Sequence, residues 1–418
     1  MKNQRIFPAF IIFLVLLIGI FILLNYYSKQ VSIRKDGYFE ISSRVKGEYN
    51  KAAEIKNRLE GFIQSQVVIE KADKNLYNLV FGKYTTTYDA GNAAFSLFLD
   101  SLLTNYRIQL DGKDTLDVYG NTLFVAKQDG MPSLFSINLP GRKISPVWSD
   151  WGEDVVSLDQ SPNMNNVFFL TVNGISKKGS LGNLNDARLY NFYRPENRVK
   201  MIDYLKNGVQ YYSYWSGGNR FMMSFTRLDS ASNQSVTQNI SVYDTTAEKI
   251  KSETRTYNLL KEGFPNPPKL NEDYTSEMNK YAVFVKKESD GKSGIYIKKT
   301  YTTDEFPLVK TGGELKSIAW SSDDTYLFFI YSDITQISKK QSKKERFLII
   351  YDADSKKIIR KFDPQDFRSI SVQGRLLIIE TGSGSDSKIL FYDYKNDKPY
   401  YALSVDGGCA IKNLPLSK

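Results

Sequence analysis

A unit of four apolar strands, separated by short polar turns, recurs from about residue 114 towards the end of the chain. The clearest copy has two strands around a tight turn at residues 315–333 and continues at residues 346–354 and 357–361. Repeated four-stranded units of this length are typical of the β-propeller fold. The pattern of apolar positions therefore predicts an all-β architecture for most of the chain.

Six such quartets can be placed, and the second strand of each is the most apolar. Strands with several successive apolar residues are buried on both faces, as expected for a sheet packed between two neighbours. We predict a six-bladed β-propeller over residues 113–412 and a C-terminal tail at 413–418, with a seventh blade if residues 66–86 contribute strands. The quartets begin near Asp114, Val155, Gly208, Leu270, Leu315 and Phe367.

A different pattern precedes the repeats, and residues 29–112 are predicted to form a helical stalk and a small α+β lead-in. Apolar residues recur every three or four positions in residues 40–65, which predicts an amphipathic helix. This helix is either a membrane-proximal stalk or short coiled coil, or a helix packed on its own domain. The spacing also predicts short strands at 66–70 and 76–81 and a second helix at 92–106.

An uninterrupted apolar run occupies residues 7–24 and follows Lys2 and Arg5. A helix of that length spans about 27 Å, which matches a bilayer core. The alternative is a cleaved secretory signal, but residues 23–28 lack the small-x-small site that cleavage requires. We predict that residues 1–28 are a cytoplasmic tail and a transmembrane signal anchor. The protein is then a single-pass protein of the cell membrane with its large C-terminal domain extracytoplasmic.

The composition excludes several chemistries. The chain has no histidine, so it cannot build a Ser-His-Asp triad, a histidine-ligated zinc site or a histidine general base. Its single cysteine, Cys409, can form neither an internal disulfide nor a cysteine-rich metal site. We therefore predict a protein that is not an enzyme and that has no metal site and no cofactor.

Residues 318–329, Ile-Ala-Trp-Ser-Ser-Asp-Asp-Thr-Tyr-Leu-Phe-Phe, resemble the TolB-like, or WD40-like (PD40), propeller repeat. The core of that repeat reads roughly Trp-Ser-Pro-Asp-Gly before an apolar strand, and Asp324 stands where the family has glycine. A weaker copy at residues 157–169 keeps Ser161 and Pro162. The resemblance implies a propeller of the periplasm that binds other envelope proteins.

Long connections between the predicted strands fall on one side of the propeller. In a four-stranded meander, the loops between second and third strands and those between blades emerge on the same side. Elaborated loops on one face of a rigid scaffold commonly carry binding sites. These loops are residues 174–186, 229–234, 261–269, 286–293, 334–344 and 382–387.

The net charge of +10 favours anionic partners, and the long loops are basic. Residues 334–344 carry four lysines and no acidic residue, which is typical of a patch for an acidic envelope protein or an anionic polymer, or of a solvated loop. Nucleic acid is not expected, because aromatic residues do not alternate with the lysines. The candidate binding residues are Lys177, Lys178, Lys339, Lys340, Lys343 and Lys344.

Paired carboxylates are the alternative functional signal, since a glycosidase needs two of them at a set separation. Acidic residues cluster between the first two quartets, and these residues equally suit turns. The leading hypothesis is a non-enzymatic, membrane-tethered propeller that binds an envelope protein or anionic polymer. The alternative is a carbohydrate-active enzyme, a glycosidase or lyase. The acidic candidates are Asp150, Glu153, Asp154, Asp159, Glu272 and Asp273.

Overall fold

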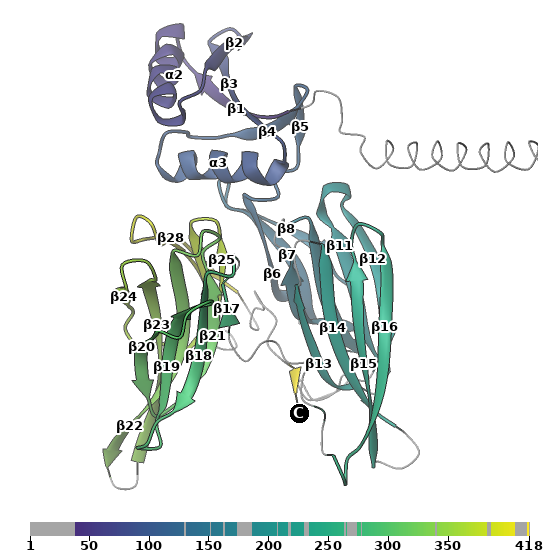
Figure 1. Ribbon diagram of the computed structural model, residues 1–418. Helices are drawn as coiled ribbons and strands as arrows, with labels where there is room; N and C mark the ends of the chain where they lie inside the picture. The colour runs from purple at the N-terminus through teal and green to yellow at the C-terminus, as the bar shows by residue number, and fades with distance from the viewer. Residues whose placement is uncertain are drawn as a thin grey trace, which may run out of the picture. The chain divides into compact units, whose positions relative to one another are not determined.

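The computed structural model in Figure 1 describes residues 38–417 except 129–130, 151, 162–163, 174–185, 207, 216–218, 230–233, 263–264, 266–273, 277, 339–340, 383–385 and 406–415. The described chain falls into two compact units, residues 38–90 with 106–115 and residues 91–105 with 116–417. The predicted anchor at residues 7–24 lies outside the described residues. Within the described part, no helix is long and apolar enough to cross a membrane.

The first unit is an α+β unit built on a five-stranded antiparallel sheet of order β2-β3-β1-β4-β5. Helix α2 packs against β2 and β3 and buries Ala52 and Leu59. The elements are β1 (Phe39–Lys46), α2 (Tyr49–Ile63), β2 (Val67–Asp73), β3 (Leu76–Tyr84), β4 (Arg107–Leu110) and β5 (Lys113–Thr115).

The helix predicted over residues 40–65 is wrong in its first part, which forms β1. Ile41 and Val45 are buried four positions apart, a spacing that fits one face of a helix and one face of a strand alike. Pairing with β3 on one side and β4 on the other selects the strand. Gly47, at φ +140°, then separates β1 from α2.

The second predicted helix is present but begins earlier, as α3 (Thr87–Leu99). The Asp89 amide donates to Thr86 Oγ1 at 3.0 Å, and the Thr86 hydroxyl donates to Asp89 Oδ2 at 2.6 Å. This reciprocal capping fixes the helix start. The helix ends where Ser101 takes φ +60° and the Leu102 amide donates to the Leu97 carbonyl.

Two predictions about the repeats are corrected by the N-terminal sheet. The first quartet was predicted to begin at Asp114, but β5 pairs with β4 instead. Residues 66–86, the source of a seventh blade, supply β2 and β3 to the same N-terminal sheet. Both segments were correctly expected to form strands. Their pairing partners place them in the N-terminal sheet and not in a blade.

Six antiparallel sheets follow in the order of the six predicted quartets. We call them sheets 1 to 6. Sheet 1 has three strands, and sheet 3 has a fifth strand because β29 (Leu416–Ser417) pairs with β13. The strands are as follows: sheet 1, β6 (Asn121–Gln128), β7 (Met131–Asn138) and β8 (Lys143–Trp148); sheet 2, β9 (Glu153–Gln160), β10 (Asn166–Asn173), β11 (Ala187–Tyr193) and β12 (Arg198–Leu205); sheet 3, β13 (Gly208–Trp215), β14 (Arg220–Leu228), β15 (Ser235–Asp244) and β16 (Lys249–Asn258); sheet 4, β17 (Tyr274–Thr275), β18 (Tyr281–Lys287), β19 (Ser293–Lys299) and β20 (Glu305–Thr311); sheet 5, β21 (Leu315–Trp320), β22 (Tyr326–Ser338), β23 (Gln341–Asp352) and β24 (Lys357–Lys361); sheet 6, β25 (Phe367–Gln373), β26 (Leu376–Thr381), β27 (Lys388–Asp393) and β28 (Lys398–Ser404).

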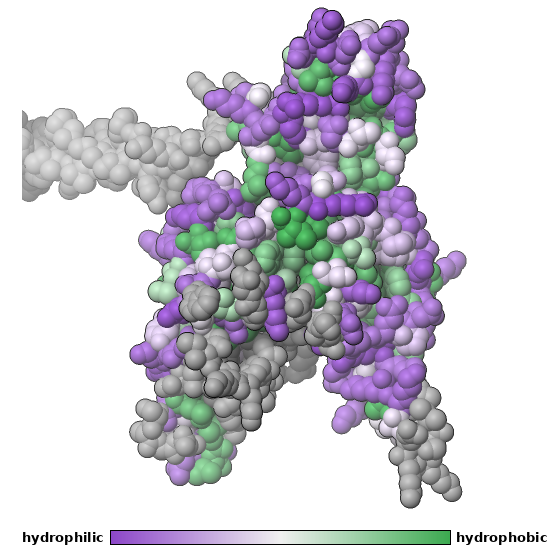
Figure 2. Space-filling view, turned by 180° about the vertical axis from the view of Figure 1, so that it is seen from behind, coloured by the Kyte–Doolittle hydropathy of each residue, from purple (hydrophilic) through white to green (hydrophobic). Residues whose placement is uncertain are grey.

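Neighbouring sheets pack face to face through their second strands. In β22, Leu327 and Phe329 enter the cluster shared with sheet 4, while Phe328 and Ile330 enter the cluster shared with sheet 6. Similar clusters join sheet 1 to sheet 2 and sheet 2 to sheet 3. The continuous apolar runs of the second strands thus arise because each side of such a strand meets another sheet. Figure 2 shows hydrophobic residues in several separate groups among hydrophilic ones on the visible face.

The last sheet also contacts the first. The Thr122 hydroxyl in β6 donates to Gln373 Oε1 at 2.9 Å, and the Gln373 amide donates to the Tyr119 carbonyl. Gly374 lies directly against the Tyr119 ring, where a Cβ would fall 0.9 Å from the tyrosine oxygen. The seam between sheets 6 and 1 is therefore made by side-chain hydrogen bonds and close contact.

One turn recurs between the first and second strands of sheets 2, 4 and 5. In sheet 5, the Ser321 amide donates to the Tyr326 carbonyl, the Asp324 amide donates to the Ser321 carbonyl, and the Tyr326 amide donates to Ser321 Oγ. Ser161 and Ser276 make the equivalent three bonds in sheets 2 and 4. The serine therefore closes the turn, which explains why the recognisable copies of the repeat keep it.

Asp324 adds a contact between sheets to this turn. It takes φ +57°, the left-handed conformation that glycine adopts freely. Its carboxylate is fully buried and accepts the Ser276 hydroxyl at 2.5 Å and the Met278 and Lys280 amides at 3.2 Å. The aspartate thus replaces the glycine of the resembled repeat because its side chain binds the turn of sheet 4.

Replacing Asp324 with glycine should lower the free energy of unfolding by about 1–3 kcal/mol, because the Ser276 hydroxyl and the Met278 amide lose their acceptor although the backbone relaxes. The Lys280 amide keeps Ser276 Oγ as its acceptor. Urea unfolding followed by tryptophan fluorescence measures this, since the buried Trp320 lies in the adjoining cluster. The exposed Asn75, at φ +58°, is the control. Asn75→Gly should change stability by less than about 0.5 kcal/mol. Equal stability of Asp324→Gly and the unmodified chain would contradict the assignment.

Candidate binding surface

The predicted binding lysines divide into two groups. Lys177, Lys178, Lys339 and Lys340 lie outside the described residues, so they stay predictions. Lys343 and Lys344 are exposed and are consecutive residues of β23, so their side chains point to opposite faces of the hairpin. The structure therefore describes two of the six candidates, and these two are neighbours in sequence.

The segment predicted as a basic loop, residues 334–344, is instead part of a hairpin. Its two arms pair from Asp333↔Glu345 to Ser338↔Gln341. None of the described strands flanks this part, because β21 and β24 pair with β22 and β23 only nearer the sheet. We call residues 333–338 and 341–345 the ribbon.

The loop prediction was wrong because it was based on composition. Lysine, glutamine and serine dominate the segment, and these residues are common in solvated loops. However, Ile334, Thr335 and Ile337 are β-branched residues, which favour strands. Pairing with β23, with a register shift between Gln336 and Ser338, then extends the strand beyond its sheet.

Each of the two described ribbon lysines forms an ion pair with an acidic residue outside residues 334–344. Lys344 Nζ lies 3.2 Å from Glu314 Oε1, and Lys343 Nζ lies 2.8 Å from Glu345 Oε1. Hydrogen bonds from Lys316 and Lys344 lower the pKa of the Glu314 carboxyl. Exposed pairs of this kind contribute little to stability, so the lysines can exchange these partners for another anion.

The base of the ribbon is held by the connection between sheets 4 and 5. Asp333 Oδ1 accepts the Thr311 hydroxyl and the Gly312 amide, both at 3.0 Å, and the Ile334 amide at 2.9 Å. Burial acts to raise the pKa of Asp333, but these hydrogen bonds together lower it. The sequence signal for this clamp, which sequence analysis missed, is the Gly312-Gly313 pair before β21.

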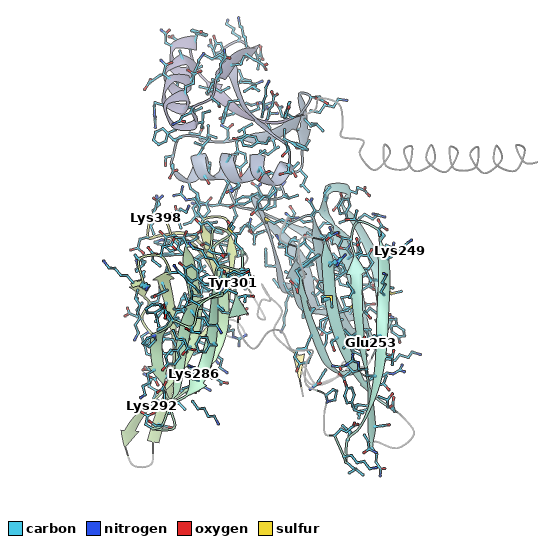
Figure 3. All side chains as sticks on the ribbon, in the orientation of Figure 1. Lys249, Glu253, Lys286, Lys292, Tyr301 and Lys398 are labelled. Atoms are coloured by element: carbon cyan, nitrogen blue, oxygen red, sulfur yellow. The ribbon has the colours of Figure 1, made fainter. Side chains whose placement is uncertain are left out.

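Further lysines of sheets 4 and 5 lie at the same end as the ribbon. Figure 3 shows Lys286 and Lys292 there, whereas Lys398 lies at the opposite end of the sheets. Ion pairs join Lys286 to Glu305 and Lys310 to Asp290. This end of sheets 4 and 5, together with the ribbon, therefore carries several exposed lysines, most of which form weak ion pairs at the surface.

The acidic candidates are not arranged as a catalytic pair. Glu153 is buried, forms an ion pair with Arg188, and accepts the Thr171 hydroxyl at 2.7 Å and the Tyr190 hydroxyl at 3.2 Å. Its neighbour Asp154 lies on the same strand, so the two side chains point to opposite faces. Burial raises the pKa of Asp154, and Lys127 offsets this in part.

Of the remaining acidic candidates, the structure describes only Asp150 and Asp159. Asp159 lies near sheet 3, with Ser213 Oγ 3.5 Å from its Oδ2. Asp150 forms an isolated bridge with Glu153, and Glu272 and Asp273 lie outside the described residues. Across the described part of the chain, acidic residues and cysteine form no group of three suited to a metal ion.

Six successive meander sheets, with apolar clusters between sheets 1 and 2, 2 and 3, 4 and 5, and 5 and 6, define a β-propeller protein. No family model matches the sequence, and no curated protein matches it either. Solved structures resemble it at the level of the fold, and they include both an enzyme and proteins of other kinds.

Three of these structures illustrate the range. TolB from Acinetobacter baumannii is 13% identical, with 85% of this chain and 82% of that chain covered and a TM-score of 0.45. A nidogen/laminin complex is 10% identical over 70% of this chain and 97% of that chain, with a TM-score of 0.40. An oligogalacturonate lyase in complex with manganese is 11% identical over 69% of this chain and 74% of that chain, with a TM-score of 0.35.

Replacing Gly313 with alanine should loosen the base of the ribbon. A Cβ there would lie 2.3 Å from the Ser332 carbonyl oxygen, so the backbone must shift, at a cost of about 1–3 kcal/mol in unfolding free energy. Urea unfolding measures the cost. Gly312→Ala is the matched control, because its Cβ would meet nothing closer than 3.7 Å. Similar losses in both variants would show that the close approach at Gly313 has no special role.

Proposed function

We propose that this protein is a non-enzymatic, membrane-tethered, six-bladed β-propeller that binds an envelope protein or an anionic polymer. The observation that carries the proposal is the ribbon, which extends beyond its sheet and presents exposed lysines. The hydrogen bonds of Asp333 hold the base of this projection, and Lys343 and Lys344 on it are exposed. Exposed positive charges favour association with a negatively charged surface and increase the rate of encounter.

Two features favour binding over catalysis. The chain offers no histidine for acid–base chemistry, and its buried Glu153 is already held by a cation and two hydroxyls. The carboxylate oxygens of Glu153 are therefore already engaged in contacts between strands of sheet 2.

The alternative is a carbohydrate-active enzyme, a glycosidase or lyase, and Asp154 is the observation in its favour. A general acid needs a pKa above the ordinary value, and burial raises that of Asp154. The described carboxylates place no partner on its face of β9. The proposal therefore gives Asp154 no catalytic role.

The membrane tether and the envelope location are inferred from the sequence. The 18 apolar residues at 7–24 suffice to span a bilayer as a helix, and no cleavage site follows them. In the proposed orientation, the short segment before the apolar run stays inside the cell and the large domain after it is exported. In this arrangement the propeller and its ribbon meet other components of the envelope.

Changing Lys339, Lys340, Lys343 and Lys344 to serine should weaken binding to an anionic probe such as polyglutamate roughly tenfold at physiological salt and flatten its salt dependence. The removed charges act over about 8 Å at that ionic strength. Fluorescence anisotropy at several salt concentrations measures both effects. Pull-down from envelope extract then tests whether a protein partner follows the same pattern.

The control is a second quadruple variant at the opposite end of sheets 5 and 6. Lys356, Lys357, Lys395 and Lys398 are exposed there, so changing them to serine removes the same charge without touching the ribbon. Both variants should keep the fold, with changes of about 0.5 kcal/mol or less per site. An equal loss of affinity in both variants would show that binding depends on net charge and not on the ribbon. A hydrolase or lyase activity that disappears in Asp154→Asn would favour the alternative function.

The tether predicts that the full chain stays with membranes after carbonate washing and that protease added to spheroplasts trims it to a small stub. The physical reason is that a helix of 18 apolar residues is not extracted by high pH, while the domain beyond it faces outward. Immunoblotting with antibodies against the propeller measures both. Protection until the cells are lysed would place the propeller in the cytoplasm.

A further inference from the structure

Among the described residues, each of the six sheets ends in an outer strand that no further strand pairs, and such a strand presents backbone amides and carbonyls that can pair with another chain. Proteins commonly block these edges with β-bulges, with proline or with charged side chains. The outer strands differ in how they are blocked. They are β8, β12, β16, β20, β24 and β28.

Five of the six outer strands carry a register shift against their neighbour, in sheets 1, 2, 4, 5 and 6. In three of them a proline stands next to the shift: Pro146 opposite Phe135, Pro307 opposite Tyr296 and Pro399 opposite Tyr392. A bulge twists the edge away, and proline removes a donor. These edges are therefore poor templates for a further strand.

Strand β16 of sheet 3 has neither a register shift nor a proline, although four of its ten residues are charged. Its ten residues pair with β15 without a shift, from Ser235↔Asn258 to Asp244↔Lys249, and none is proline. Nine of the ten are exposed, all except the half-buried Tyr257. Figure 3 shows Lys249 and Glu253 along this strand. It is the longest of the outer strands, and its backbone edge is regular along its whole length.

We propose that two copies of this chain pair antiparallel through their β16 strands, with Thr254 of one copy opposite Thr254 of the other. This register places Glu253 opposite Arg255 twice and Lys251 opposite Tyr257 twice. Opposite charges at facing positions stabilise an antiparallel pair, and like charges destabilise it. A register centred on Glu253 would oppose that residue to itself and Lys251 to Arg255, so it is disfavoured.

The charged groups that this register uses are available in the single copy. Arg255 Nη2 lies 2.8 Å from Glu253 Oε1 of its own strand, and both side chains are more than half exposed, at 56% and 63%. A pair this exposed exchanges partners at little cost. The remaining facing pairs in this register carry no charge: Ser252 opposite Thr256 and Ile250 opposite Asn258.

Site-directed cross-linking tests the register in the full chain, purified in mild detergent and with Cys409→Ser as the background. Thr254→Cys should give a covalent dimer on mild oxidation, because the two cysteines face each other across the two-fold axis. Ser252→Cys is the matched control. Its two cysteines would be about four positions apart, roughly 13 Å along the strands, beyond disulfide reach.

A charge swap tests the same register without cysteines. Glu253→Arg and Arg255→Glu should each weaken dimerisation about tenfold, because each creates two like-charge pairs by symmetry. The double variant restores both pairs and should return to within about threefold of the unmodified chain. Sedimentation velocity over a range of concentrations measures the dimer constants. Since the positions are exposed, melting temperatures should be unchanged and would report any folding defect.

Three outcomes would overturn the proposal. The unmodified chain could sediment as a monomer at every concentration. Thr254→Cys and Ser252→Cys could cross-link equally, which would indicate random collision. The double charge variant could associate no better than the single variants, which would contradict the proposed pairing of Glu253 with Arg255. The proposal is supported if Thr254→Cys cross-links, Ser252→Cys does not, and the double charge variant restores dimerisation.

Discussion

The rest of the propeller depends on the seam between its last and first sheets. Sheet 1 has only three strands, and no described strand of sheet 6 completes it, so side chains must hold the two together. Gln373 binds Thr122 and Tyr119 across the seam. Beside it, Arg375 pairs with the fully buried Asp393 of its own sheet at 3.0 Å and with Asp100, in the segment before sheet 1, at 2.9 Å. Removing one partner of a buried pair leaves an uncompensated charge, which is strongly destabilising.

This seam also explains the roles of two less conspicuous features. Residues 91–105 belong to the same compact unit as the sheets, and they bring Phe95 against Tyr119 and Tyr400 and Asp100 to Arg375. Gly374 permits the contact with Tyr119 that any Cβ would prevent. The helix segment before the first sheet is thus part of the fold of the repeats, although its sequence shows no sign of the repeat.

The six sheets were predictable from the sequence because their second strands are buried on both sides, which leaves runs such as Phe328-Phe329-Ile330. Contacts between distant residues were not predictable. Ser276 closes the same turn as Ser321, yet it lacks the tryptophan that marks the repeat, and β1 has a spacing shared by helix and strand. For the candidate surface, the sequence located Lys343 and Lys344 but not Glu314, which is thirty positions from Lys344.

The same comparison shows which kinds of recognition this chain can support. Its carboxylates and hydroxyls are largely occupied in turns and between sheets, as Asp324, Glu153 and Asp333 illustrate. A chain without histidine has little left for proton transfer at neutral pH. Two features are exposed to solvent: the ribbon, which carries lysines, and the outer strand β16, which pairs with β15 without a bulge. Strand addition and charge pairing both use these groups directly, because neither needs a buried pocket.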